Sequence, residues 1–272
     1  MKESKTPQYS YRKTIVAGIA GNLMEWYDFA IYGYMVPVIS GLFFPSDDPF
    51  ASTMATFGAF AAGYFARPLG GVLFGHIGDK IGRKAVLTLS VTLMGLSTFL
   101  IGVLPDASQI GTAAAVLLVL LRILQGLSVG GEYTGSVTFV LEHAPAKSRA
   151  FATSWIGVGA SLGFLIGSGV GALVMSIFNE GQLHSWAWRL PFLAGILIAV
   201  IGYLIRRHAP EPPAPQNNLQ LDTHPAIAAF RDEWANMLRL MGLALAVNSG
   251  FYMMFVYATS YLTEQMHVCL LY

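Results

Sequence analysis

The sequence contains very little charge and almost no cysteine. The single cysteine among 272 residues, Cys269, excludes a disulfide within the chain and cannot form a metal cluster by itself. Charged residues make up only 11% of the chain, whereas an ordinary soluble domain has about 25%. The formal net charge of +1 offers no support for nucleic-acid binding. This balance is typical of a protein with several membrane spans.

Motifs for catalysis and for cofactor binding are also missing. The sequence has no Gly-rich phosphate loop ending in Lys-Ser/Thr and no Gly-x-Ser-x-Gly elbow. Its six histidines do not have the spacing of zinc ligands. We therefore expect a protein that is not an enzyme and that uses neither a metal nor a cofactor.

Long apolar segments fill most of the chain, which is 54% hydrophobic with a mean hydropathy of +0.56. A membrane-spanning helix needs about 20 mostly apolar residues. The sequence predicts an all-α membrane protein in the lipid bilayer, with a short N-terminus, a bundle of six spans, a proline-rich linker, a seventh span and a tail. The predicted spans are 15–42, 53–74, 85–104, 112–140, 150–178, 189–207 and 239–262, and the other segments are 1–14, 208–238 and 263–272.

The basic residues fall on alternate connections. If the N-terminus and every second loop share one side, that side holds 13 of the 16 Lys and Arg residues. The opposite loops carry acids and no Lys or Arg, so the positive-inside rule predicts a cytoplasmic N-terminus. Of the other three arginines, we expect Arg67 and Arg189 to snorkel from helix ends, while Arg122 lies well inside a span.

Two spans carry polar residues along one face. An ionisable side chain in hydrocarbon costs at least ~2.5–3.5 kcal/mol on insertion scales, so such residues are functional candidates. At 100° per residue each set falls within one arc of its helix, and the two stripes are expected to face a shared watery cavity. The first span contributes Asn22, Glu25, Asp28 and Tyr32, and the fourth contributes Arg122, Gln125, Glu132, Tyr133 and Ser136.

The chemistry of these side chains suggests roles in solute and proton coupling. Arg122 presents a planar fork of donors that suits the carboxylate of an acidic or zwitterionic solute. Burial favours the neutral form of a carboxylate, so Glu25, Asp28 and Glu132 are candidates for proton uptake and release. An alternative is that Arg122 pairs permanently with one of these acids to hold helices together. Asn22 and Asp28 have the same alternative role in helix packing.

Glycines mark two further features. Gly159, Gly163, Gly167 and Gly171 repeat every four residues in the fifth span and predict a face for close helix packing, which could also slide during a conformational change. The stretch 75–84 predicts a charged cytoplasmic turn between two spans. Its candidate gating residues are Gly75, Gly78, Asp79, Gly82, Arg83 and Lys84.

Four motifs carry a resemblance to a known family. The sequence GHIGDKIGRK (75–84) resembles the signature loop of major facilitator superfamily transporters. The motifs GNLMEWYDFAIYGY (21–34), RPLGGVLFGHIGDKIGRK (67–84), RILQGLSVGGEYTGS (122–136) and SWAWRLPF (185–192) are similar to its metabolite:proton symporters, which include proline/betaine, shikimate, alpha-ketoglutarate and citrate carriers.

The resemblance implies a proton-coupled secondary transporter of the bacterial inner membrane that carries a small solute by alternating access between two six-helix bundles. It also implies that Asp79 and Arg83 help to hold the cytoplasmic side closed. Family members run to about twelve helices, so we expect this chain to be a truncated form that lacks a carboxy-terminal half. The alternative is a non-transporting membrane protein, or a half-transporter that needs a partner chain.

Overall fold

The computed structural model describes residues 11–208 and 231–253. The chain divides into two compact units, Met1–Ala214 and Pro215–Tyr272. The described part of the second unit contains helix α11, Trp234–Tyr252. The predicted seventh span began later, at 239, and its end lies outside the described residues. Every regular element in the described ranges is helical, as the prediction of an all-α protein requires.

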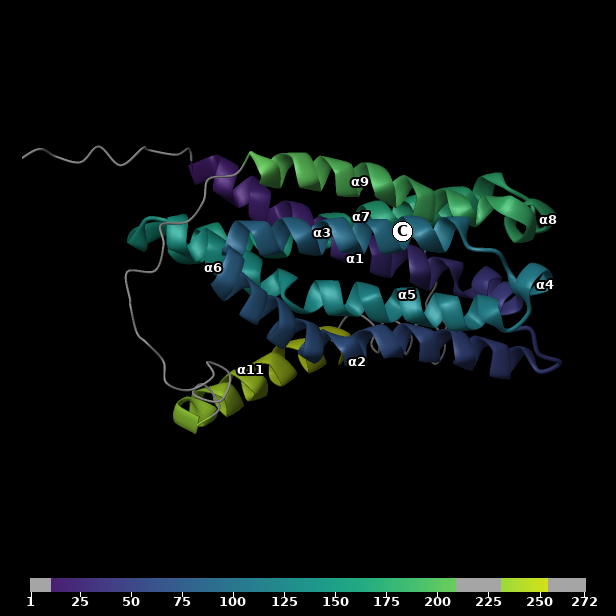
Figure 1. Ribbon diagram of the computed structural model, residues 1–272, viewed down its shortest axis with the longest axis horizontal. Coiled ribbons are helices and arrows are strands. Elements are labelled where there is room, and N and C mark those ends of the chain that lie inside the picture. Colours follow the sequence, from purple (N-terminus) through teal and green to yellow (C-terminus); the bar gives the residue numbers. More distant parts are fainter. Residues whose placement is uncertain (1–10, 209–230, 254–272) are drawn as a thin grey trace, which may run out of the picture. The chain divides into compact units, whose positions relative to one another are not determined.

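The long helices of the first unit run along a common direction (Figure 1). Helix α1 packs mainly against α7, α2 against α5, and α3 against α9. The helices are α1 Tyr11–Phe43, α2 Pro49–Ile81, α3 Arg83–Val103, α5 Ala113–Gly130, α6 Glu132–His143, α7 Arg149–Ile177 and α9 Arg189–Arg207. Short elements connect them, namely α4 Ala107–Ile110, η1 Ala146–Ser148, α8 Glu180–Gln182 and the π-turn η2 Leu183–Ala187.

Length and composition make four segments of the described chain suitable for crossing a membrane. They are Lys84–Val103, Ala113–His143, Ala146–Ile177 and Arg189–Arg207. Helices α1 and α2 have 33 residues each, which at 1.5 Å per residue is about 50 Å and exceeds a hydrocarbon core of about 30 Å. Helices α1 and α2 are not among these four segments, because polar and charged residues interrupt their hydrophobic sequence.

Helix α2 continues through most of the stretch that was expected to form a turn. Asp48 caps its start by accepting a hydrogen bond from the N–H of Phe50 at 2.9 Å, and the helix then runs to Ile81. The prediction of a turn over 75–84 was wrong in extent, because only Gly82, with φ of 93°, leaves the helical conformation. Lys80 lies in the last turn, where a cation is favoured by the helix dipole.

The fourth predicted span consists of two helices. Helix α5 ends at Gly130 and α6 begins at Glu132, with Gly131 between them. The expected stripe from Arg122 to Ser136 is therefore divided between two helices, and within it Tyr133 is exposed. Arg122 and Gln125 belong to α5, and Glu132 belongs to α6.

The glycine face of α7 lies against α1. Gly159, Gly163, Gly167 and Gly171 are all buried. A Cβ atom added at Gly163 would lie 2.2 Å from the carbonyl oxygen of Leu23, so the two backbones touch there. This contact fixes α1 along much of its length and thereby positions its polar residues.

Candidate functional site

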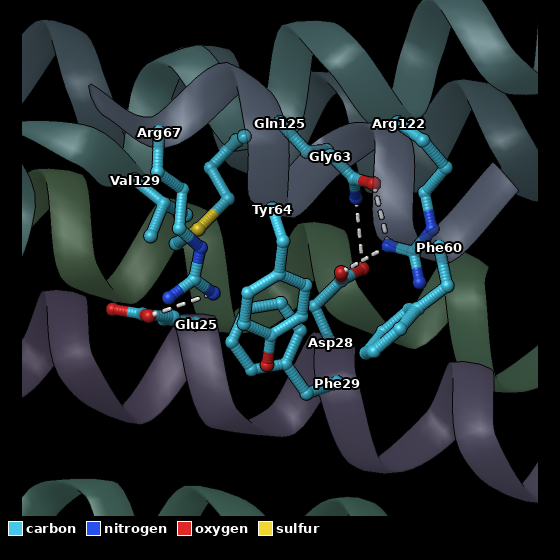
Figure 2. A pocket seen from close by; sticks show the side chains of 12 residues that line it. Glu25, Asp28, Phe29, Phe60, Gly63, Tyr64, Arg67, Arg122, Gln125 and Val129 are labelled. Atoms are coloured by element: carbon cyan, nitrogen blue, oxygen red, sulfur yellow. Dashed lines mark hydrogen bonds and ion pairs between the residues drawn. The ribbon is translucent and has the colours of Figure 1, made fainter. Parts of the chain in front are cut away.

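A pocket between α1, α2, α3 and α5 brings together two arginines and two carboxylates (Figure 2). The acids come from α1, one arginine comes from α2 and the other from α5. Aromatic rings and small residues form the remaining walls. The pocket is lined by Glu25, Asp28, Phe29, Phe60, Gly63, Tyr64, Arg67, Met94, Arg122, Gln125, Gly126 and Val129.

Close packing of α2 on α5 brings the two arginines to one pocket. A Cβ atom at Gly126 would lie 1.9 Å from the carbonyl oxygen of Gly63, and one at Gly63 would lie 2.8 Å from the carbonyl oxygen of Arg122. Only glycine allows this approach, because any larger residue would collide with backbone. The sequence predicted the glycine face of α7 but not this second glycine contact, between α2 and α5.

Arg122 is held by a network that crosses three helices. Its Nη1 donates to Asp28 Oδ2 at 2.6 Å and to Gln125 Oε1 at 2.7 Å. The Gln125 amide donates to Asp28 Oδ1 at 2.8 Å and to Thr98 Oγ1 at 2.8 Å, and Thr98 Oγ1 donates to Asp28 Oδ1 at 2.9 Å. Thr98 on α3 was not predicted, because threonine in an apolar span carries no charge to mark it.

Two other donors of Arg122 are not used in this network. The guanidinium lies 3.6 Å from the ring centre of Tyr32. No described residue accepts a hydrogen bond from Nε or Nη2, although both atoms are buried. Arg122 is therefore paired through one nitrogen only.

Glu25 forms the second ion pair, with Arg67. Glu25 Oε1 lies 3.2 Å from Arg67 Nη2, and their side chains are 4% and 26% exposed. The guanidinium lies 4.1 Å from the ring centre of Tyr64 and 4.5 Å from that of Phe29. The expectation that Arg67 snorkels from a helix end was wrong, because it lies well inside α2 and points into the pocket (Figure 2).

Glu132 lies outside this pocket in a second buried cluster. It accepts hydrogen bonds from Arg206, Ser90 and Ser136, and Arg206 Nη1 reaches Glu132 Oε2 at 2.9 Å. Arg206 is only 2% exposed. Its assignment to the basic cytoplasmic surface was wrong, because the carboxylate on α6 draws it into the bundle. Arg122 is thus not the only arginine inside a span.

The remaining predicted residues are scattered. Tyr32 is buried and donates to the carbonyl oxygen of Thr56 at 3.0 Å. Asn22 is buried and donates to the carbonyl oxygen of Gly18 at 3.4 Å. Tyr133 is 53% exposed. The two predicted stripes thus meet in one pocket only through part of their residues, namely Glu25 and Asp28 with Arg122 and Gln125. Arg189 begins α9 and donates to the carbonyl oxygens of Gly102 and Leu104 at the end of α3.

The gating pair cannot be placed. The side chains of Asp79 and Arg83 lie outside the described part of the structure, so their interaction stays a prediction. Of the other residues in that set, Gly78 accepts the backbone hydrogen bond from Gly82 at 3.0 Å that ends α2.

The pocket places charged and polar side chains from several helices around one small enclosed space. One side of the pocket carries the pair Arg67 and Glu25, and the other carries the pair Arg122 and Asp28, so the charges of the pocket balance. Each arginine lies over an aromatic face, which attracts cations in a water-poor site. An arginine edge without a partner is suited to a carboxylate, and a carboxylate oxygen without a partner is suited to a cation or a proton.

Comparison with known proteins identifies relatives over nearly the whole chain. The family model described as Major Facilitator Superfamily matches residues 18–270. The glycine betaine/proline/ectoine/pipecolic acid transporter OusA of Dickeya dadantii is 38% identical over 94% of this chain and 54% of its own length. The shikimate transporter of Escherichia coli is 38% identical over 94% of this chain and 60% of its own length.

A solved structure shares the fold. The inward-open xylose transporter XylE from E. coli matches 90% of this chain and 57% of its own chain, with a TM-score of 0.66 and 20% identity. This likeness concerns the fold alone. The chain spans about half the length of the first curated relatives that it matches.

Proposed function

Because the chain belongs to the Major Facilitator Superfamily, we propose that it provides half of the solute pathway of a proton-coupled secondary transporter. The solute is a small organic acid or zwitterion, and transport proceeds by alternating access. The observation that carries this proposal is the buried pocket with two arginine–carboxylate pairs, one of which leaves an arginine edge unpaired. Relatives named as proline/betaine and shikimate transporters support it.

The proposed roles follow from the contacts. Arg122 binds the solute carboxylate, and Asp28 with Gln125 orients its guanidinium. Glu25 takes up and releases the proton, because protonation would remove the charge that holds Arg67 and would free a cation in the pocket. Asp79 and Arg83 are proposed to hold the cytoplasmic side closed together with a second bundle.

The proposed orientation places the N-terminus in the cytoplasm of a bacterial cell, with the bundle in the inner membrane. The distribution of basic residues supports it. In a Cys269→Ser background, Lys80→Cys should react only with a reagent that enters the cytoplasm, and Asp47→Cys should react with an impermeant reagent added outside. Both positions lie at helix ends on opposite sides of the bundle. The reverse labelling pattern would overturn this orientation.

Uptake into proteoliposomes tests the function. Vesicles contain this chain alone, or this chain with the carboxy-terminal half of a transporter such as OusA. A pH gradient should drive uptake of proline, glycine betaine or shikimate, and collapse of the gradient should abolish it. Uptake only with the added half would identify a half-transporter that needs a partner chain. No gradient-driven uptake under either condition, with folded protein in the vesicles, would refute the proposal.

A further inference from the structure

Three carboxylates buried inside the bundle differ in the hydrogen bonds that they accept. Glu25, Asp28 and Glu132 are each at most 3% exposed. Asp28 and Glu132 both accept hydrogen bonds from one arginine and from two neutral side chains. In contrast, no described residue donates to Oε2 of Glu25. A buried polar oxygen normally has a donor, since leaving it unpaired is unfavourable, so Glu25 lacks a partner that the other two acids have.

Arg67 is the charged neighbour of Glu25, but it does not supply the missing donor. Its Nη2 lies 3.2 Å from the other carboxylate oxygen, Oε1, and makes no hydrogen bond within the described part of the chain. The guanidinium lies instead close to the ring faces of Phe29 and Tyr64. The contact is therefore an ion pair without a hydrogen bond, and Oε2 remains open.

A second open acceptor lies about one turn away on the same face of α1. Asn22 is 0% exposed, and its Nδ2 donates to the carbonyl oxygen of Gly18 at 3.4 Å, whereas its Oδ1 has no donor among the described residues. Residues three apart on a helix have their Cβ atoms about 5–6 Å from each other. Long helical side chains lean toward the amino terminus, and Figure 2 shows the Glu25 carboxylate extending along α1 away from Asp28. Glu25 thus leans toward the turn that carries Asn22.

These two neighbouring groups need one hydrogen that neither of them has. An ionised carboxylate and an amide oxygen can only accept hydrogen bonds, whereas a protonated carboxylic acid has one O–H donor. The bond from Nδ2 to Gly18 leaves the oxygen of the Asn22 amide, and not its nitrogen, available to Glu25. A proton on Oε2 would therefore supply the donor that Oδ1 lacks.

The other charges near Glu25 are already paired with each other. An Asp28–Arg122 pair joins α1 to α5, and a Glu132–Arg206 pair joins α6 to α9. The second pair lies against α1 at Gly21, where an added Cβ would meet both side chains. Helices α3 and α7 also pack on α1, and they carry charges only in their first turns. The charged groups that face Glu25 are thus Asp28 on α1, Arg67 on α2, Arg122 on α5, Glu132 on α6 and Arg206 on α9.

We propose that Asn22 is the positioning residue for a proton on Glu25, an assignment that rests on the proposed function and adds the group that holds the proton. In the protonated form Glu25 has taken one proton from water, is neutral, and donates from Oε2 to Asn22 Oδ1. In the deprotonated form that proton has returned to water, and Glu25 is a carboxylate whose charge is balanced by Arg67. The O–H bond of Glu25 is the one covalent bond that forms and breaks.

Infrared difference spectroscopy during a pH titration of the purified full chain in detergent tests this assignment. A protonated carboxylic acid has a carbonyl stretching band that a carboxylate lacks, and loss of one such band in Glu25→Gln identifies the band of Glu25. Asn22→Leu removes the acceptor with little change in volume. We expect this variant to lower the midpoint pH of the Glu25 band by about 0.5–1 unit, a proton affinity about three- to tenfold weaker, because the protonated form loses one hydrogen bond.

The direction of the shift distinguishes between possible arrangements. A higher midpoint in Asn22→Leu would mean that the amide donates to the carboxylate, and an unchanged midpoint would mean that the two side chains do not meet. Either result would overturn the assignment. Ser40→Ala removes another buried hydrogen-bonding side chain from α1 and is the matched control, which should leave the midpoint unchanged.

Asn22→Asp tests the proximity of the two side chains independently. Two neighbouring carboxylates compete for one proton, so the midpoint of the Glu25 band should rise by about one unit or more. An unchanged midpoint would contradict the assignment, because the two oxygens would then lie too far apart to share a proton.

Each variant is first checked for monodisperse elution and an unchanged far-UV spectrum, and Asn22→Ala carries the same expectation if Asn22→Leu does not fold. The titration does not require transport. Absence of proton-driven uptake together with the expected shifts would therefore refute transport and leave the assignment of Asn22 standing. Uptake by the parent together with an unshifted midpoint in Asn22→Leu would overturn the assignment and leave transport standing.

Discussion

Replacement of Arg206 by methionine tests how far the buried cluster at Glu132 stabilises the bundle. Glu132 is 0% exposed, and Arg206 on α9 is its charged partner. Removing one member of a buried ion pair costs about 3–5 kcal/mol, because an uncompensated charge remains. Arg206 also donates to the carbonyl oxygens of Ala17 and Leu87. We therefore expect Arg206→Met to lower the free energy of unfolding by at least about 3 kcal/mol.

Combining Arg206→Met with Glu132→Gln separates the effect of the unpaired charge on Glu132 from the other effects of losing Arg206. Glu132→Gln removes the carboxylate charge but keeps a polar group beside Ser90 and Ser136, which both donate to Glu132. Because the residual charge is gone, Arg206→Met combined with Glu132→Gln should be less destabilised than the sum of the single variants by about 2 kcal/mol or more. The exposed neighbour Arg207→Met should change stability by no more than about 0.5 kcal/mol.

The measurement is equilibrium unfolding by SDS in mixed micelles, followed by far-UV circular dichroism. The parent and the four variants are compared at one detergent ratio and one pH. An Arg206→Met variant within about 1 kcal/mol of the parent, or strictly additive single variants, would refute the argument that this pair is a buried and coupled charge pair.

Two glycine substitutions test the backbone contacts. Gly163→Ala should destabilise the bundle by about 1–3 kcal/mol, since its Cβ would meet the Leu23 carbonyl oxygen at 2.2 Å. The control Gly169→Ala on the same helix has open space around the added Cβ and should be neutral or stabilising. Equal effects of the two variants on unfolding in SDS would contradict the close contact. Gly82→Ala should cost about 1–3 kcal/mol, because Gly82 has φ of 93° and ψ of 148°, a region that essentially only glycine adopts. Gly75→Ala should not destabilise the protein. Indistinguishable melting temperatures of the two variants would show that the turn does not need a positive φ.

Helix periodicity predicted which residues share a face but not which partners they meet. Glu25 and Asp28 were placed on one face of the first span, and both line the pocket. Their arginines come from different helices, Arg67 from α2 and Arg122 from α5. That choice depends on how far each helix is displaced along its neighbour, which the glycine contacts between α2 and α5 decide.

Charge counting gave a misleading position for Arg206. The residue lies beside Arg207 at the end of the last span of the bundle, and both were counted as cytoplasmic. The structure separates them, since Arg207 is exposed and Arg206 is buried against Glu132. Two adjacent residues on a helix point about 100° apart, so one can face solvent while the other faces the bundle. A count of charges along the chain does not contain that distinction.

The sequence by itself determined the membrane class, the all-α architecture and the family, because these follow from the length of apolar segments and from short motifs that are local in the chain. The tertiary structure decided the extent of the turn at Gly82, the break at Gly131 and the division of the polar residues into two separate clusters. The physical reason is that a buried charge selects its partner across helices. Its position is therefore fixed by packing between segments that are distant in sequence.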